Sequence, residues 1–242
     1  MDIDGSVALV TGANRGIGKA IAEELLARGA RKVYAAVRNP DAITDPRLVA
    51  LRLDVTDPDS VAQAARVASD VDLLVNNAGI GGVSTPLQAS LARARAELET
   101  NYLGVVSMTQ AFAPVLAGNG GGTIVNLLSV VSWVGVPHLT TYSASKAAAW
   151  SYSNAARVQL AAQGTHVVGV HVGYVETDLT EGLDGEKIAP EQVAVAVLDA
   201  VAANAPEAIV DEFSRDAKAG LSDDQNLIYP AIREQFAAAA TA

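Results

Sequence analysis

The sequence predicts an α/β fold in which helices cover both faces of a parallel, doubly wound sheet. Short runs of β-branched or aliphatic residues alternate with longer helical patterns along most of the 242 residues, as in strand–helix–strand units. Several of these short runs are apolar throughout, which is typical of strands covered on both faces. The glycine and proline clusters are short enough to be loops, so we expect a single domain over residues 1–242.

Each expected element follows from a local pattern. In the first helix Ile17, Ile21 and Leu25 recur at four-residue spacing and form one buried stripe, and Gly29 supplies a left-handed stop. Two longer helical stretches, residues 98–116 and 142–163, are rich in Ala, Ser and Val, so their faces are suited to close packing on a partner. The expected strands are residues 7–10, 32–37, 48–53, 73–75, 123–128, 166–172 and 208–210.

Composition argues against several classes of function. Seventeen basic and 27 acidic residues give a net charge of −10, which repels nucleic-acid phosphates and anionic lipid head groups. The absence of cysteine excludes disulfides, thiolate metal sites and a cysteine nucleophile. His166 and His171 fall on opposite faces of an expected strand, so we expect no metal site there. Without a secretory pattern or a membrane-length apolar run, the sequence predicts a soluble, cytoplasmic protein.

A glycine-rich turn follows the first expected strand and opens a helix. Glycine tolerates positive φ and lets a pyrophosphate approach the backbone, while the free N–H groups at the helix start favour negative charge. Taken alone, the glycines are also compatible with a simple tight turn. The position between strand and helix favours a dinucleotide phosphate site, and its candidate cofactor-binding residues are Gly12, Asn14, Arg15, Gly16, Ile17 and Gly18.

Three motifs in this order make the sequence resemble the short-chain dehydrogenase/reductase family. They are the Thr-Gly-x-x-x-Gly-x-Gly loop at residues 11–18, Asn-Asn-Ala-Gly at residues 76–79 and Tyr-Ser-Ala-Ser-Lys at residues 142–146. The resemblance extends from about residue 7 to residue 178. It implies a Rossmann fold with about seven parallel strands, a nicotinamide cofactor, a small-molecule substrate and a homodimer or homotetramer.

Four residues form the expected catalytic group. Tyr142 and Lys146 are four residues apart in a helical pattern, so their side chains emerge on one face. Such a pair alone is more often a solvated helix face, but here a neighbouring ammonium is expected to lower the pKa of the phenol and make Tyr142 a general acid. The resemblance implies that Lys146 also holds the nicotinamide ribose, that Ser129 positions the substrate oxygen and that Asn101 holds a water for proton relay.

The resemblance assigns further residues to the cofactor. Asp54 and the backbone of Val55 would hold the adenine edge, although Asp54 taken alone is better explained as a cap for the helix that begins near residue 57. Residues 76–79 match the family segment that lines the cofactor, which adds Asn77, Ala78 and Gly79. In Gly-Tyr-Val-Glu-Thr-Asp at residues 173–178, Gly173, Val175 and Thr177 match the segment that binds the nicotinamide carboxamide. Tyr142 and Lys146 border the cofactor as well.

The second strand favours NADP(H) over NAD(H). In dinucleotide-binding folds an acid about 20 residues beyond the glycine loop bonds the ribose 2′-hydroxyl of NAD, whereas an arginine accommodates the 2′-phosphate of NADP. Counting from Gly18 leads to Arg38, and no acid precedes Asp41. Arg15 supplies a second cation, so two guanidiniums are expected to face one phosphate.

The expected activity is NADPH-dependent reduction of a ketone or aldehyde, reversible as an alcohol dehydrogenase. Alternatives are an epimerase or dehydratase, for which the chain lacks a substrate domain, and a non-catalytic dinucleotide sensor or scaffold. A short substrate lid is expected at residues 177–189, with glycines that would let it move. The candidate substrate-pocket residues are Trp133, His138, Tyr174, Leu179 and Leu183.

Overall fold

A seven-stranded parallel sheet forms the centre of the molecule. The computed structural model describes residues 1–182 and 185–239, and its strand order is β3-β2-β1-β4-β5-β6-β7. The strands are β1 (Val7–Thr11), β2 (Lys32–Val37), β3 (Val49–Arg52), β4 (Leu73–Asn76), β5 (Gly122–Leu127), β6 (Thr165–His171) and β7 (Glu207–Ile209). All seven strands expected from the sequence are present, and each end agrees to within one residue. The predicted fold class is therefore confirmed.

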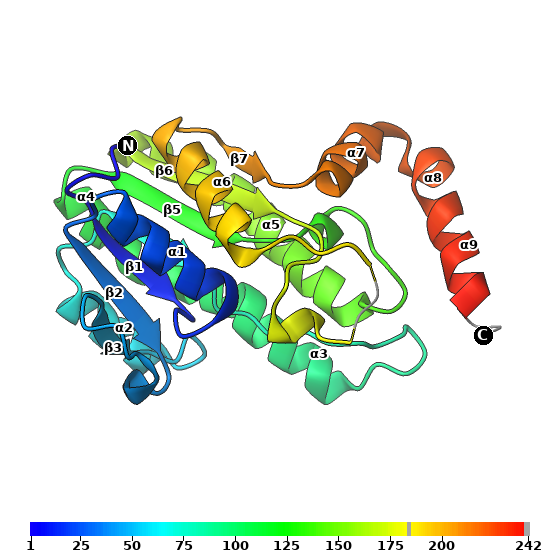
Figure 1. Cartoon of the computed structure of the whole chain (residues 1–242), viewed down its shortest axis with the longest axis horizontal. Helices are drawn as coiled ribbons and strands as arrows, with labels where there is room; N and C mark the ends of the chain where they lie inside the picture. Colours follow the sequence, from blue (N-terminus) through cyan, green and yellow to red (C-terminus); the bar gives the residue numbers. More distant parts are fainter. Residues whose placement is uncertain (183–184, 240–242) are drawn as a thin grey trace.

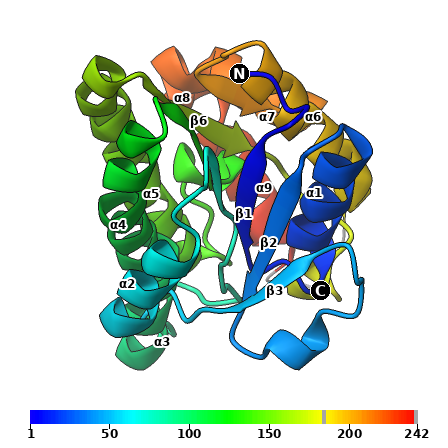
Figure 2. The same cartoon turned by 90° about the vertical axis from the view of Figure 1, so that its left-hand side faces the viewer.

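Two helical layers cover the sheet, and alternating strand residues face each of them. Ala8 and Val10 of β1 pack with α1 (Gly16–Ala27) and α6 (Pro190–Ala202), while Val7 and Leu9 face the opposite side. That second layer contains α2 (Pro58–Val67), α4 (Gly104–Gly118) and α5 (Thr140–Leu160). Figure 2 shows the two layers on either side of the strands.

The helix expected at residues 98–116 is divided in the structure. It consists of α3 (Leu91–Leu98), a π-helical turn (Glu99–Leu103) and α4. A π-helical turn inserts a wider ring into the hydrogen-bond ladder and changes which side chains face inward after it. The turn contains Asn101, whose side chain is buried, so the interruption lies at a residue assigned to the site.

The chain continues beyond β7 as a C-terminal arm, defined here as residues 211–239. It contains α7 (Glu212–Gly220), α8 (Asp224–Leu227) and α9 (Tyr229–Ala239). Figure 1 shows these helices extending past the end of the sheet, on the side away from β2 and β3. No helix in the described part of the chain is long and apolar enough to span a membrane.

Candidate active site

The glycine loop between β1 and α1 is a turn that side chains cannot enter. Gly12 and Gly16 have φ of +68° and +53°, a region that glycine adopts readily. A Cβ on Gly18 would lie 2.4 Å from the Gly12 oxygen and 2.4 Å from Asn77 Nδ2. The loop therefore requires glycine at this spacing, and it leaves the start of α1 facing the carboxyl end of the sheet.

The segment after β4 is tied to the end of β1. Thr11 Oγ1 accepts hydrogen bonds from the backbone N–H groups of Asn77 and Ala78, both at 2.9 Å, and Asn77 Nδ2 donates to the Thr11 oxygen at 2.8 Å. β1 and β4 are the neighbours between which the strand order reverses, which is where ligands bind in open α/β sheets. These bonds hold the two sides of that crevice together.

A cleft of about 2880 Å³ opens at this edge of the sheet. It is lined by the glycine loop, by Ser129 after β5 and by Tyr142 and Lys146 of α5, so elements far apart in sequence meet in one space. Most of the candidate cofactor residues line it: Gly12, Asn14, Arg15, Gly16, Ile17, Arg38, Asp54, Val55, Asn77, Ala78, Gly79, Gly173, Val175 and Thr177. Gly18 is buried inside the turn instead.

Tyr142 and Lys146 emerge on the same face of α5, as their spacing predicts. Lys146 Nζ lies 5.7 Å from the centre of the Tyr142 ring and donates a hydrogen bond of 2.6 Å to the Leu127 oxygen at the end of β5. Lys146 is 5% exposed. The ammonium is thus held between the phenol and the sheet.

The pKa of Tyr142 departs from the sequence-based expectation. Burial raises the pKa of the Tyr142 phenol, hydrogen bonding with Ser129 opposes this, and the charge of Glu97 adds to the rise. Burial also lowers the pKa of Lys146 to about 8. The expectation of a lowered phenol pKa is therefore wrong for this structure, because burial is the largest cause of the shift and acts in the opposite direction. The phenol is held in its protonated form.

Ser129 and Asn101 complete the group in different ways. The Ser129 hydroxyl donates to the Val172 oxygen at 3.3 Å and borders the cleft. Asn101 is 1% exposed and lies behind the cleft lining. Its side chain accepts from the Ile80 N–H at 2.9 Å, donates to the Ile80 oxygen at 2.7 Å and donates to Ser145 Oγ at 2.9 Å. Asn101 thus connects the loop after β4 to α5.

Two charged candidates at the cofactor end, Asp54 and Arg15, have protein partners of their own. Asp54 accepts from the Thr56 N–H at 3.0 Å and from its hydroxyl at 2.7 Å, which lowers the pKa of the carboxyl. The cap of α2 is Asp57, so the helix-cap alternative for Asp54 is wrong. Arg15 forms an exposed ion pair with Asp178. Such pairs contribute little stability, so a phosphate can compete for the guanidinium.

On the substrate side, the structure agrees with three of the candidate pocket residues and contradicts the assignment of Trp133. His138, Tyr174 and Leu179 line the cleft, and His138 Nε2 is 3.1 Å from the Tyr174 hydroxyl. Trp133 does not line it, because its ring stacks on buried His171 at 3.7 Å and borders a second cavity of about 570 Å³. Leu183 lies outside the described residues, so the lid expected at 177–189 is described only in part.

Several residues that line the cleft could not be predicted from a sequence motif. Leu227, Ile228, Ala231 and Ile232 of the C-terminal arm border the cleft, and Tyr229 fixes the arm by accepting a hydrogen bond of 3.2 Å from the Gly135 N–H. Asp211 accepts from the Gly173 N–H at 2.7 Å and so holds the segment that precedes the lid. No motif marks these positions. The described residues contain no group of three or more His, Cys, Asp or Glu that could hold a metal ion.

Comparisons with known proteins agree on one family. Residues 6–187 match the family described as short chain dehydrogenase. The 3-oxoacyl-[acyl-carrier-protein] reductase FabG of Vibrio cholerae is 34% identical over 196 residues, covering 77% of this chain and 80% of that protein, and the protein of the same name from Escherichia coli is 35% identical over 196 residues, with the same coverage.

A solved structure extends this similarity to almost the whole chain. A short chain dehydrogenase from Burkholderia cenocepacia, crystallised in complex with NADP, has 40% sequence identity and a TM-score of 0.92, covering 96% of this chain and 99% of that chain. The chain belongs to the short-chain dehydrogenase family.

Proposed function

We propose that this enzyme reduces a ketone or aldehyde to an alcohol with NADPH, and that Tyr142 donates the proton. The observation that carries the proposal is the meeting of Ser129, Tyr142 and Lys146 with the glycine loop in one cleft. The names of the relatives support it: the FabG proteins are 3-oxoacyl reductases, and the structure with 40% identity was crystallised in complex with NADP. The same residues would serve alcohol oxidation in reverse.

The cleft fits a nicotinamide dinucleotide. A pyrophosphate needs a close approach to backbone N–H groups at a helix start, and the turn has glycine at positions 12, 16 and 18, where a Cβ would crowd its neighbours. At the far end of the same crevice, Arg38 follows β2 and suits a 2′-phosphate. Gly12 to Gly18 would hold the pyrophosphate, Lys146 the ribose, and Val175 and Thr177 the carboxamide.

The reaction needs a hydride, which the reduced nicotinamide supplies when bound. The protein's own part is to orient the carbonyl and to provide the proton. Ser129 would donate a hydrogen bond to the carbonyl oxygen, and Tyr142 would transfer its proton to that oxygen as negative charge develops there. The raised pKa of the phenol suits this role, because the proton is retained until an alkoxide forms. Lys146 would then stabilise the phenolate left behind.

The substrate side of the cleft favours an apolar carbonyl compound. Val134 and Leu139 are buried and Val136 is half-buried, and all three line the cleft together with Tyr142, Leu179 and Ile232. Apolar walls around a few polar groups are typical of small-molecule sites. We therefore propose a ketone or aldehyde with an apolar substituent as the substrate class.

Steady-state oxidation of NADPH against a panel of ketones and aldehydes tests the proposal. Turnover of at least one apolar member, with weaker use of NADH, is the expected result. Tight NADPH binding without turnover of any member would instead identify a dinucleotide sensor.

We also propose that the chain forms a homodimer or homotetramer. The contact between subunits would use residues 105–113 of α4 and residues 147–155 of α5. Light scattering that reports a monomer at micromolar concentration would contradict this assembly.

A further inference from the structure

Arg93, Glu97 and Asn101 form a stripe along α3 and the π-helical turn, at four-residue spacing. Residues with this spacing share one face of a helix. Asn101 already belongs to the catalytic group, whereas Arg93 and Glu97 have no role in the mechanism above. Two of the three side chains contact the loop after β4, because Asn101 bonds Ile80 and Arg93 Nη2 donates to the Gly81 oxygen at 3.3 Å. The stripe therefore faces the loop that covers Tyr142.

Glu97 is an unusual residue for its position. Its side chain is 1% exposed, its Oε1 accepts a hydrogen bond of 3.3 Å from Arg93 Nε, and its Oε2 is buried without a hydrogen-bond partner. A buried carboxyl with one unsatisfied oxygen is costly, and an apolar residue would fill the same helix position more cheaply. Packing alone therefore does not account for an acid here.

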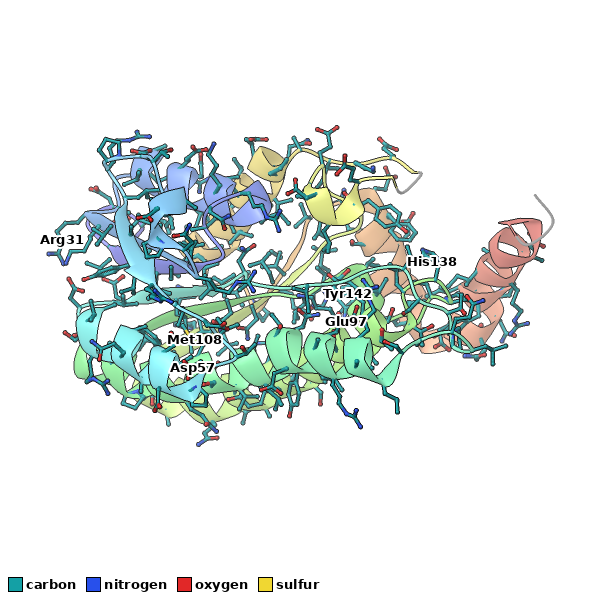
Figure 3. The ribbon with its side chains drawn as sticks, turned by 90° about the horizontal axis from the view of Figure 1, so that it is seen from below. Arg31, Asp57, Glu97, Met108, His138 and Tyr142 are labelled. Atoms are coloured by element: carbon teal, nitrogen blue, oxygen red, sulfur yellow. The ribbon has the colours of Figure 1, made fainter. Side chains whose placement is uncertain are left out.

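The surroundings bring Glu97 close to the proton donor. A Cβ on Gly81 would lie 2.7 Å from Tyr142 Cδ2, and one on Gly82 would lie 1.6 Å from Arg93 Nη2. The two glycines thus lie between the phenol ring and the guanidinium that pairs with Glu97. Glu97 and Tyr142 are labelled next to each other in the view of Figure 3, and the carboxylate charge raises the pKa of the phenol.

We propose that Glu97 is a positioning residue for the reduction: held by Arg93, its carboxylate keeps the transferable proton on Tyr142 until the substrate oxygen takes it. This inference rests on the proposed function. A negative charge beside a phenol disfavours phenolate, so it opposes Lys146, which favours phenolate. Among the charged groups of the described residues, Lys146 on the same helix lies 5.7 Å from the Tyr142 ring and Glu97 on α3 acts on the phenol through its charge. Arg93 acts through Glu97, with which it pairs, and also contacts Gly81 of the intervening loop.

The test is the pH dependence of kcat/KM in both directions for wild type and Glu97→Gln. The alkaline limb of reduction and the acidic limb of oxidation should both move to lower pH, by about one pH unit, because the phenol loses its proton more easily without the carboxylate. Glu97→Asp, which keeps the charge, should retain the wild-type profile. Glu99→Gln is the matched control, since it removes an equal charge from an exposed site two residues away, and it should not move the limbs.

Arg93→Gln gives a second test on a half-exposed side chain. Without the Arg93 cation, the Glu97 carboxylate is less neutralised and raises the phenol pKa further. Both limbs of the pH profiles should therefore move to higher pH, opposite to the effect of Glu97→Gln. Unmoved limbs in both variants, with normal NADPH binding, would overturn the role of Glu97. Should wild type turn over no carbonyl compound, the reductase proposal fails by itself. The Glu97 proposal is then tested by titrating the ultraviolet absorbance of phenolate. The Tyr142 signal is the difference between the titration of the wild type and that of Tyr142→Phe, and the midpoint of this signal must move to lower pH when the protein carries Glu97→Gln.

Discussion

The two ends of the cleft are built in different ways. The cofactor end is formed by backbone, with positive-φ glycines and a hydrogen-bonded seam between Thr11 and Asn77. The substrate end is formed by side chains from the segment after β5, the lid segment and the C-terminal arm. The arm leaves large apolar groups such as Phe213 and Leu227 more than 60% exposed. The family match ends at residue 187, before this arm begins.

The difference reflects what each end must recognise. A dinucleotide has a fixed shape, so the backbone that holds it tolerates few residue types, and glycine spacing becomes visible in a sequence. A substrate pocket needs only apolar walls at suitable distances, and many side chains on different helices can supply them. Variants of Tyr142, of His171, of Arg38 at the cofactor end and of the C-terminal arm should therefore change different properties of the enzyme.

Tyr142→Phe tests the centre shared by both ends and should have the largest effect. Carbonyl reduction should fall by about a thousandfold or more, because only the transferable proton is lost, while the fold and NADPH affinity stay near those of wild type. Single-turnover and steady-state rates, with a fluorescence titration of NADPH, would measure this. Turnover close to that of wild type would exclude Tyr142 as the proton donor.

His171 links Ser129 to the C-terminal arm, and its protonation should weaken the fold. Its Nδ1 lies 3.2 Å from the Ser129 oxygen, and Trp133 on its ring in turn lies under Lys218 of the arm at 4.6 Å. Burial lowers the pKa of His171 to about 4 from its ordinary 6.5, with the neighbouring cations Lys218 and Arg157 adding to this. The unfolded chain thus binds the proton more tightly. Stability is complete above pH 6.5 and is lost as the pH falls towards 4.

The loss should reach about 3 kcal/mol in the free energy of unfolding, at about 1.4 kcal/mol per pKa unit. Urea unfolding between pH 7 and pH 4 would measure it. His171→Gln should flatten this part of the pH dependence, whereas His166→Gln, at an exposed position of the same strand, should leave it unchanged. Equal slopes in wild type and His171→Gln would assign the pH dependence to other groups.

The fold and the cofactor end can be predicted from the sequence, because both depend on local residue patterns. Strand bounds follow from apolar runs, and the Tyr142 and Lys146 pair follows from helical spacing. Burial decides what the sequence leaves open. The pKa of the phenol depends on the low-dielectric surroundings of α5, and Glu97 becomes notable only because α3 places it inside the molecule.

Trp133 is a residue that the sequence assigned to the substrate pocket and that the structure places elsewhere. Its position four residues after Ser129 suggested the substrate pocket, but the short helical turn at Val130–Ser132 directs the chain so that the ring reaches His171 of β6. Which side of a loop a side chain takes is set by the packing of β6 and α7 against it. Neither element is near Trp133 in sequence.

Arg38→Asp tests the cofactor end alone. We expect wild type to prefer NADPH over NADH by at least about tenfold in kcat/KM, which needs only about 1.4 kcal/mol. The substitution should erode or reverse this preference, because a carboxylate repels the 2′-phosphate and can bond a ribose 2′-hydroxyl. KM for the carbonyl substrate should stay the same. Equal efficiency of both cofactors in wild type would remove the role of Arg38 in this choice.

The smallest effect is expected from Ile232→Ala in the C-terminal arm. Ile232 borders both the cleft and the second cavity, so its truncation removes apolar contact from the substrate side without touching the glycine loop. KM for bulky apolar ketones should rise by roughly threefold, as expected when a few methylene contacts are lost, while small ketones and NADPH affinity should change little. Val158→Ala, at an exposed site on α5, is the matched truncation and should change none of these values. A loss of NADPH affinity in Ile232→Ala would show that the arm also supports the cofactor, and the two ends of the cleft would then not be independent.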